Sequence, residues 1–186
     1  MTSPTGTTAK SNVGLTYGLI GGIVMIVYTL CLYLAGIGTF MNMSLSLLAY
    51  VLIIAIATMA GLKHRKQQGG YISFAEALRT VFLTFVLAFL LSTIFNYVLL
   101  NYIDTGFRDQ MTQVTLERVE EMMRKFGAPE TEIEKAMERT ANSNNYSIGN
   151  TLLGYGVMCI ISCLVSLVIA AIIKKNRPPF DNAFKE

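Results

Sequence analysis

The sequence predicts an all-α fold: an integral membrane four-helix bundle with an extracytoplasmic helical hairpin between the third and fourth spans. The 186 residues are 53% hydrophobic and only 15% charged, whereas a soluble domain usually carries about 25% charged residues. Four runs contain no charged residue: 13–36, 44–62, 81–103 and 151–173. Each is close to the roughly 20 residues that a helix needs to cross a bilayer. Most of the acidic residues lie between the third and fourth runs, which marks a polar segment outside the bilayer.

The chain begins with a short segment rich in Thr and Ser, 1–12, which is predicted to be a flexible cytoplasmic tail. The first three spans follow within 13–103. The first run is too long, and its leader too polar, for a cleaved signal peptide. Gly14, Gly18 and Gly22 recur at a spacing of four, which places them on one helix face and lets another helix approach closely. This face is predicted to pack within the chain, with a dimer interface as the alternative.

A basic cluster follows the second span directly. It consists of Lys63, His64, Arg65 and Lys66. Short cytoplasmic loops carry an excess of Lys and Arg, so the cluster predicts that this loop faces the cytoplasm. His64 is the only histidine, and no carboxylate or second ligand lies beside it in the sequence. We therefore interpret it as a solvated residue at the membrane interface.

The start of the third span carries a helix-initiation signal. Gly69 and Gly70 are predicted to break the preceding helix. Ser73, followed three residues later by Glu76, matches a capping box. Arg79 lies a further three residues along, where it can pair with Glu76 on the same helix face. The helix that follows is longer than a bilayer core requires, so its first turns are predicted to lie in the headgroup layer. We interpret this stretch as a structural cap.

Asn96 lies in the outer half of the third span. An asparagine inside a bilayer usually bonds to another helix, so Asn96 is predicted to hold helices together. Substrate binding by Asn96 is the alternative. Asn101, further along the same span, is predicted to lie at the outer interface.

Residues 104–148 form the one sizeable polar region, and they are predicted to fold as an extracytoplasmic hairpin of two helices. Apolar residues recur in its first half at helical spacing. They are Met111, Val114, Val119, Met122 and Phe126. Gly and Pro at 127–129 end this first helix. The apolar stripe is predicted to pack on the second helix or on the membrane face, with partner binding as the alternative.

The fourth span is predicted over 149–173, and a cytoplasmic tail over 174–186. Small residues recur along the span and favour close helix packing. They are Gly149, Gly154, Gly156, Ser162, Ser166 and Ala170. The three cysteines, Cys31, Cys159 and Cys163, all fall inside spans and are interpreted as small packing residues.

Charge predicts how the chain is threaded. The side that holds the termini and 63–79 carries the bases Lys10, Lys63, Arg65, Lys66, Arg79, Lys174, Lys175, Arg177 and Lys185 and the acids Glu76, Asp181 and Glu186. The other side carries the remaining bases, which are fewer, and three quarters of the 12 acids. Because an excess of Lys and Arg marks the cytoplasmic side, both termini are predicted to be cytoplasmic.

The pattern as a whole resembles a known family. The most specific stretch is 70–77, Gly-Tyr-Ile-Ser-Phe-Ala-Glu-Ala, and Lys-Lys-Asn-Arg-Pro follows the fourth span. With four spans and a charged outer segment, the chain resembles the Bacteroidota membrane family catalogued as domain of unknown function 4199. The resemblance covers nearly the whole chain. It implies a location in the bacterial inner membrane, and it implies no activity and no catalytic residues.

The residue types available limit the possible functions. No Asp, Glu, Lys, Arg or His lies in the middle of a span. Intramembrane enzymes need a catalytic group of side chains there, such as Ser with His, paired Asp, His with Asp, or metal ligands. We therefore expect no enzyme, no cofactor, and no catalytic, cofactor-binding or metal-binding residue. The basic clusters are too small for nucleic-acid binding, and no small-molecule ligand is identifiable.

The sequence thus favours a non-enzymatic, multi-pass protein in contact with the lipid bilayer. It would pack with itself, as a homo-oligomer, or with a partner membrane protein. The alternative is a small transporter or channel subunit. Its polar path would have to come from uncharged residues of the third span, Thr84, Ser92, Thr93 and Asn96, together with tyrosines.

Overall fold

The computed structural model describes residues 12–142 and 145–175, and every regular element in these ranges is helical. Four helices are long and apolar enough to cross a membrane, which confirms the all-α, four-span prediction. They are α1 (Val13–Leu34), α3 (Met43–Gln67), α4 (Phe74–Val98), which continues as the π-helix η1 (Leu99–Ile103), and α7 (Ile148–Ile173). The predicted tails lie outside the described residues, apart from Asn12, Lys174 and Lys175.

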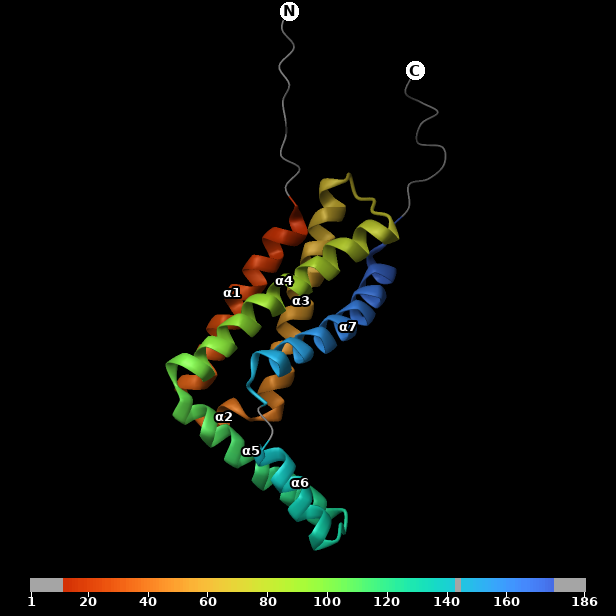
Figure 1. The fold of residues 1–186 in the computed structure, drawn as a ribbon. Coiled ribbons are helices and arrows are strands. Elements are labelled where there is room, and N and C mark those ends of the chain that lie inside the picture. The colour runs from red at the N-terminus through yellow and green to blue at the C-terminus, as the bar shows by residue number, and fades with distance from the viewer. Residues whose placement is uncertain (1–11, 143–144, 176–186) are drawn as a thin grey trace, which may run out of the picture.

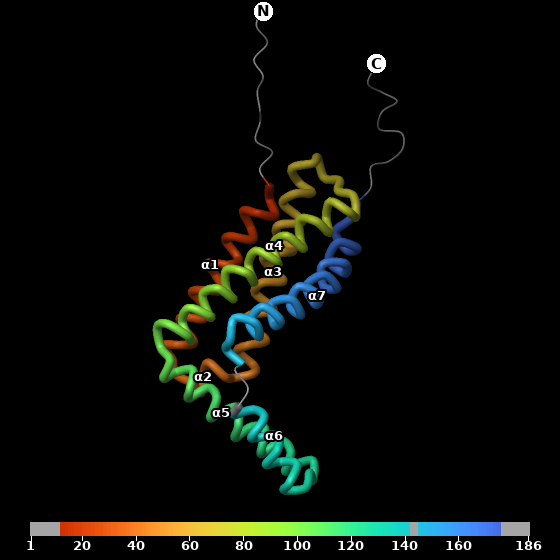
Figure 2. Tube along the Cα trace, in the orientation of Figure 1, coloured from red at the N-terminus to blue at the C-terminus, as the bar shows by residue number. Residues whose placement is uncertain are grey.

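Helix α4 is the centre of the bundle, because α1, α3 and α7 each pack against it (Figure 1). The start of α1 and the end of α7 lie at the same end as the turn between α3 and α4, which we call the turn end. The trace in Figure 2 shows the chain leaving the opposite end, after η1, to form the hairpin. The hairpin consists of α5 (Thr105–Lys125) and α6 (Glu130–Asn142), and the short α2 (Ile37–Phe40) lies near its base.

The glycine face of α1 packs on α4. A Cβ added at Gly14 would lie 3.0 Å from the carbonyl oxygen of Thr80, and one at Gly18 would lie 2.8 Å from the Cβ of Leu87. Gly22 faces Leu91 in the same way. These contacts leave no room for larger side chains, so the face is used within the chain.

The core lies where α4 meets α3 and α7. Ile53, Val81 and Phe85 are at most 2% exposed. From α7, Ser166 and Ala170 are fully buried in the same region. Small residues at these contacts let the helix backbones approach, and close packing is the main source of helix association in lipid.

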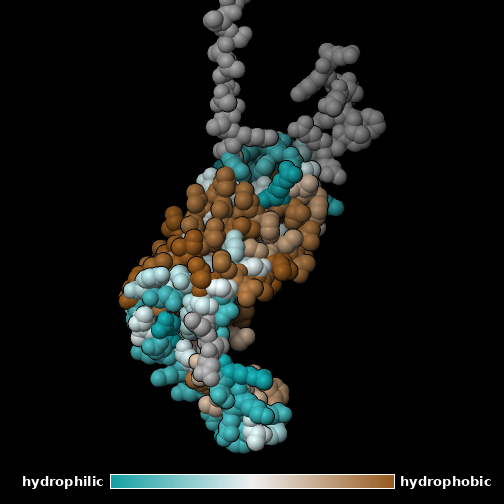
Figure 3. Space-filling view, in the orientation of Figure 1, coloured by the Kyte–Doolittle hydropathy of each residue, from teal (hydrophilic) through white to brown (hydrophobic). Residues whose placement is uncertain are grey.

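Large apolar side chains cover the outside of all four spans. Ile23, Val51, Ile94 and Ile160 are each more than half exposed. Figure 3 shows, on one face of the molecule, a hydrophobic belt between two hydrophilic ends. Exposed apolar area of this extent would be a liability in water, and it suits contact with lipid chains.

The hairpin is less closely packed than the bundle. Ile133 of α6 is buried, but α6 does not cover the end of the apolar stripe on α5, contrary to the predicted packing on the second helix. Met122 is 54% exposed and Phe126 is 84% exposed. The turn at Gly127, where φ is +72°, reverses the chain immediately after Phe126, so α6 cannot cover this residue.

Candidate functional site

The turn between α3 and α4 joins three of the four spans. Gly69 and Gly70 adopt φ values of +77° and +90°, a region that favours glycine. The predicted capping box is present: the amide of Glu76 donates to Ser73 Oγ, and the Glu76 carboxylate accepts from the amide of Ser73 at 3.2 Å. The turn therefore fixes the direction in which α4 starts.

The same turn holds the end of α7. The backbones of Ile72 and Lys175 exchange two hydrogen bonds, each 3.0 Å long. From the last turn of α3, Arg65 Nε donates to the carbonyl oxygen of Gly70 at 2.9 Å, and Nη1 donates to that of Ile173 at 3.4 Å. Arg65 thus satisfies a carbonyl at the C-terminus of α7, which would otherwise lack a partner.

His64 is part of a side-chain network, which corrects the interpretation of a merely solvated residue. Its Nδ1 lies 2.7 Å from Thr80 Oγ1, and its Nε2 lies 2.9 Å from Gln68 Nε2. Gln68 Nε2 also donates to Glu76 Oε1 at 3.3 Å. The sequence neighbours of His64 contain no carboxylate, but the turn folds α4 back beside α3 and brings Glu76 within reach through Gln68.

The network has a consistent set of donors and acceptors. The Thr80 hydroxyl donates to the carbonyl oxygen of Glu76 at 2.9 Å, so it is free to accept from Nδ1 of His64. The Gln68 amide then donates to Nε2. This pattern holds the histidine, the glutamine and the carboxylate in fixed positions.

A cavity of about 590 Å³ lies beside this network, where α1, α3 and α4 meet. Its lining includes Asn12, His64, Gln67, Gln68, Glu76, Arg79, Thr80, Phe82 and Leu83. The predicted pair between Glu76 and Arg79 is not formed, because Ser73 and Gln68 occupy the carboxylate. Within the described residues Arg79 makes no ion pair, so a carboxylate and a guanidinium line one cavity separately.

Among the described residues Asn96 bonds within its own helix, which corrects its predicted role of joining two helices. Its Nδ2 donates to the carbonyl oxygen of Ser92, one turn earlier on α4, at 2.9 Å. The contact between segments is made by Asn101, whose Nδ2 donates to the carbonyl oxygen of Tyr146 at 3.1 Å, just before α7. Asn101 lies in η1, and a π-helical turn points side chains in directions that α-helical spacing does not predict.

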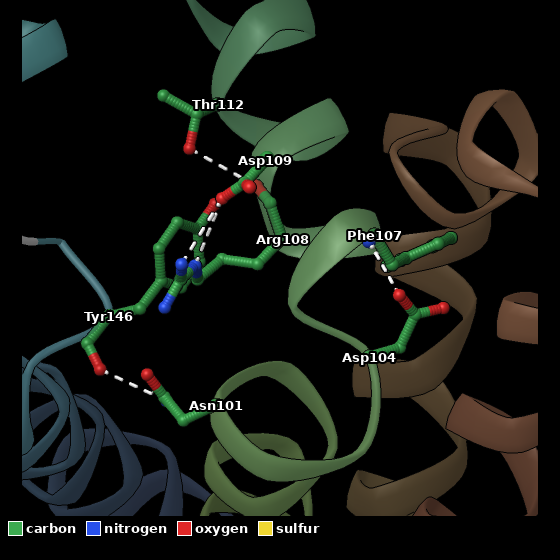
Figure 4. Close-up of polar contacts among 7 residues, drawn as sticks. All are labelled: Asn101, Asp104, Phe107, Arg108, Asp109, Thr112 and Tyr146. Carbon is green, nitrogen blue, oxygen red and sulfur yellow. Dashed lines mark hydrogen bonds and ion pairs between the residues drawn. The ribbon is translucent and has the colours of Figure 1, made fainter.

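The base of the hairpin forms a second polar cluster, shown in Figure 4. Asp104 caps α5 by accepting from the amide of Phe107 at 2.8 Å, and it also accepts from the hydroxyl of Tyr33 on α1 at 2.7 Å. These bonds hold the pKa of Asp104 below its ordinary value of 3.8. Arg108 pairs with the neighbouring Asp109 at 3.2 Å. The cluster attaches the hairpin to the bundle.

We expect Tyr33→Phe to make the protein more sensitive to acid. The charged form of Asp104 stabilises the fold fully above its unfolded pKa, and this contribution is lost as the pH falls through the lowered folded pKa. Without the Tyr33 donor the folded pKa rises towards 3.8, so the midpoint of acid unfolding, followed by circular dichroism in micelles, moves to higher pH. Tyr28→Phe is the control, because Tyr28 donates to the neutral carbonyl of Leu45. Equal midpoints for the two variants would contradict this role of Tyr33.

Within residues 12–142 and 145–175, no three His, Cys, Asp or Glu side chains gather closely enough to hold a metal ion. His64 contacts the hydroxyl of Thr80 and the amide of Gln68. The turn end thus presents charged groups of both signs, Glu76 and Arg79, to one cavity.

A family model described as Protein of unknown function (DUF4199) matches residues 16–175. No curated protein and no solved structure matched.

Proposed function

We propose that this chain, which belongs to the family described as Protein of unknown function (DUF4199), is a non-enzymatic membrane protein that acts by packing with a second copy of itself or with a partner membrane protein. The family and the four apolar helices support a membrane protein. The resemblance of the sequence to a Bacteroidota membrane family supports a location in the inner membrane. The distribution of Lys and Arg supports cytoplasmic termini and an outer hairpin.

The observation that carries the proposal is an uncovered helix face on α7. Gly149 and Gly156 are seven residues apart, so they lie on one face, and a Cβ added at either would meet no atom within 4 Å. Leu153 and Ile160 lie on the same face and are 70% and 66% exposed. Alternating small and large residues let a second helix approach closely. The glycine face of α1, by contrast, is already filled by α4.

Cysteine crosslinking in native membranes tests this proposal. In a background without Cys31, Cys159 and Cys163, Leu153→Cys should give an oxidant-dependent crosslinked product, while Ile23→Cys, on the exposed face of α1, should not. Adding Gly156→Leu should abolish the product, because the leucine fills the space that the partner helix needs. The mass of the product distinguishes a second copy from another protein. Equal crosslinking at both positions, or none at Leu153→Cys, would refute the proposed face.

A small transporter or channel subunit is the second candidate. Two cavities of about 280 and 230 Å³ in the outer half of the bundle share Phe89, Asn96 and Met158. Their lining is mostly apolar, and its polar groups, among them Asn96, are uncharged, which suits a neutral solute. Towards the turn end the path is closed by buried core residues, among them Val81 and Phe85. A transporter would have to open this core.

Swelling of proteoliposomes in glycerol measures the second candidate directly. A transporter of neutral solutes should accelerate swelling, and Asn96→Leu should abolish the acceleration, while Ile94→Leu, on the exposed side of α4, should leave it unchanged. Swelling no faster than that of empty liposomes would count against this candidate and leave the packing proposal intact.

A further inference from the structure

The cavity at the turn end has the size and lining of a binding site. Its volume of about 590 Å³ lies within the roughly 300–1,000 Å³ of small-molecule sites. The end of α3 supplies His64 and Gln68, and the first turns of α4 supply Glu76 and Arg79. Hydrogen bonds already order His64, Gln68 and Glu76 in the wall of the cavity.

The charges in this cavity are separated and of opposite sign. The Glu76 carboxylate is held in place by Ser73 Oγ at 2.8 Å and by Gln68. The Arg79 guanidinium, one turn along α4, keeps its donors available, since no described carboxylate pairs with it. A guanidinium matches the geometry of a phosphate group. A carboxylate has about four lone-pair sites; Ser73 and Gln68 fill three of those on Glu76, so its Oε1 can still accept from an ammonium group.

The cavity also spans the boundary between polar and apolar surface. Glu76 and Arg79 lie in the first turns of a candidate span, Phe74–Ile103, and no later residue of that span is charged. Phe82 and Leu83, the next residues of the lining, belong to the apolar part of α4. A ligand in this position would meet polar groups at one end and apolar groups at the other.

We propose that this cavity binds a phospholipid with an ethanolamine headgroup, with Arg79 on the phosphate and Glu76 on the ammonium. The acyl chains would leave along Phe82 and Leu83 into the hydrophobic belt. A headgroup with phosphate alone would satisfy Arg79 but leave the Glu76 carboxylate beside a second negative charge, which is unfavourable. A soluble phosphoethanolamine has the same polar chemistry but makes no use of the apolar part of the lining.

Thermal unfolding of the full-length protein in micelles tests this site. Titrated phosphatidylethanolamine should raise the midpoint temperature at concentrations at least tenfold lower than phosphatidylglycerol does. Arg79→Gln should weaken the response to phosphatidylethanolamine at least tenfold. Lys66→Gln is the matched control: it removes a cation from the same end of the bundle but from outside the cavity lining, so the response should stay within about twofold. A tenfold change in the lipid concentration needed corresponds to roughly 1.4 kcal/mol of binding free energy, which is the order of one charged contact.

Glu76→Gln separates the ammonium contact from the phosphate contact. Glutamine keeps the capping box but removes the charge, so the preference for phosphatidylethanolamine over phosphatidylglycerol should disappear while phosphatidylglycerol still binds. An equal response of Arg79→Gln and Lys66→Gln, or a Glu76→Gln variant with an unchanged preference, would overturn the proposal. Stabilisation by soluble phosphoethanolamine as strong as that by the lipid would overturn the lipid as the source and retain the two charge contacts.

Discussion

Gly18→Val should lower the free energy of unfolding by about 3 kcal/mol, the upper part of the usual range for overpacking. A Cβ at this position would lie 2.8 Å from Leu87 Cβ and 3.3 Å from the carbonyl oxygen of Thr84. Neither atom is the end of a flexible side chain, so the clash is relieved only if α1 moves away from α4. Separation would also weaken the hydrogen bond from Thr84 Oγ1 to the carbonyl oxygen of Gly14.

Gly154→Val is the matched control for this change. It introduces the same side chain in the middle of a span, at a glycine whose added Cβ would meet no atom within 4 Å. Reversible unfolding in mixed micelles should show a small change in the free energy of unfolding for Gly154→Val and a large decrease for Gly18→Val. Similar losses for both variants would mean that helix propensity, and not the contact between α1 and α4, sets the effect.

Arg65→Met should lower the free energy of unfolding by about 2 kcal/mol, in line with the loss of hydrogen bonds from a charged donor. It removes the donors to the carbonyl oxygens of Gly70 and Ile173, and these link the turn to the end of α7. Hydrogen exchange should therefore accelerate at the end of α7 as well as in the turn. Lys66→Met, at the adjacent exposed position, should change neither the free energy of unfolding nor the rate of hydrogen exchange appreciably. Unchanged exchange at the end of α7 in Arg65→Met would contradict the link.

Local patterns in the sequence predicted the parts of the fold that depend on local physics. Four charge-free runs identified four spans, because span length is set by bilayer thickness. The pattern of Ser73 and Glu76 predicted the capping box, because both partners lie within one helical turn. The spacing of Gly14, Gly18 and Gly22 predicted a close-packed face, and the structure supplies its partner, α4.

The local patterns in the sequence did not predict contacts between segments that are far apart in the chain. His64 reaches Thr80 only because the turn sets α4 beside α3, and Tyr33 bonds to Asp104 across 71 positions of the chain. The bond to the segment before α7, at Tyr146, is made by Asn101, which lies in the π-helical turn at the end of α4, and not by Asn96. Glu76 was assigned to Arg79 by spacing alone, whereas Gln68, eight residues earlier, is its partner across the turn.

Labelling of single cysteines with a membrane-impermeant maleimide tests the proposed orientation in the inner membrane most directly. In a cysteine-free background, Phe126→Cys at the exposed tip of the hairpin should react in intact spheroplasts. Lys66→Cys, at the turn end, should react only after the membrane is permeabilised. The reverse pattern, or reaction of both positions in intact spheroplasts, would contradict a four-span protein with its basic turn in the cytoplasm and its hairpin outside.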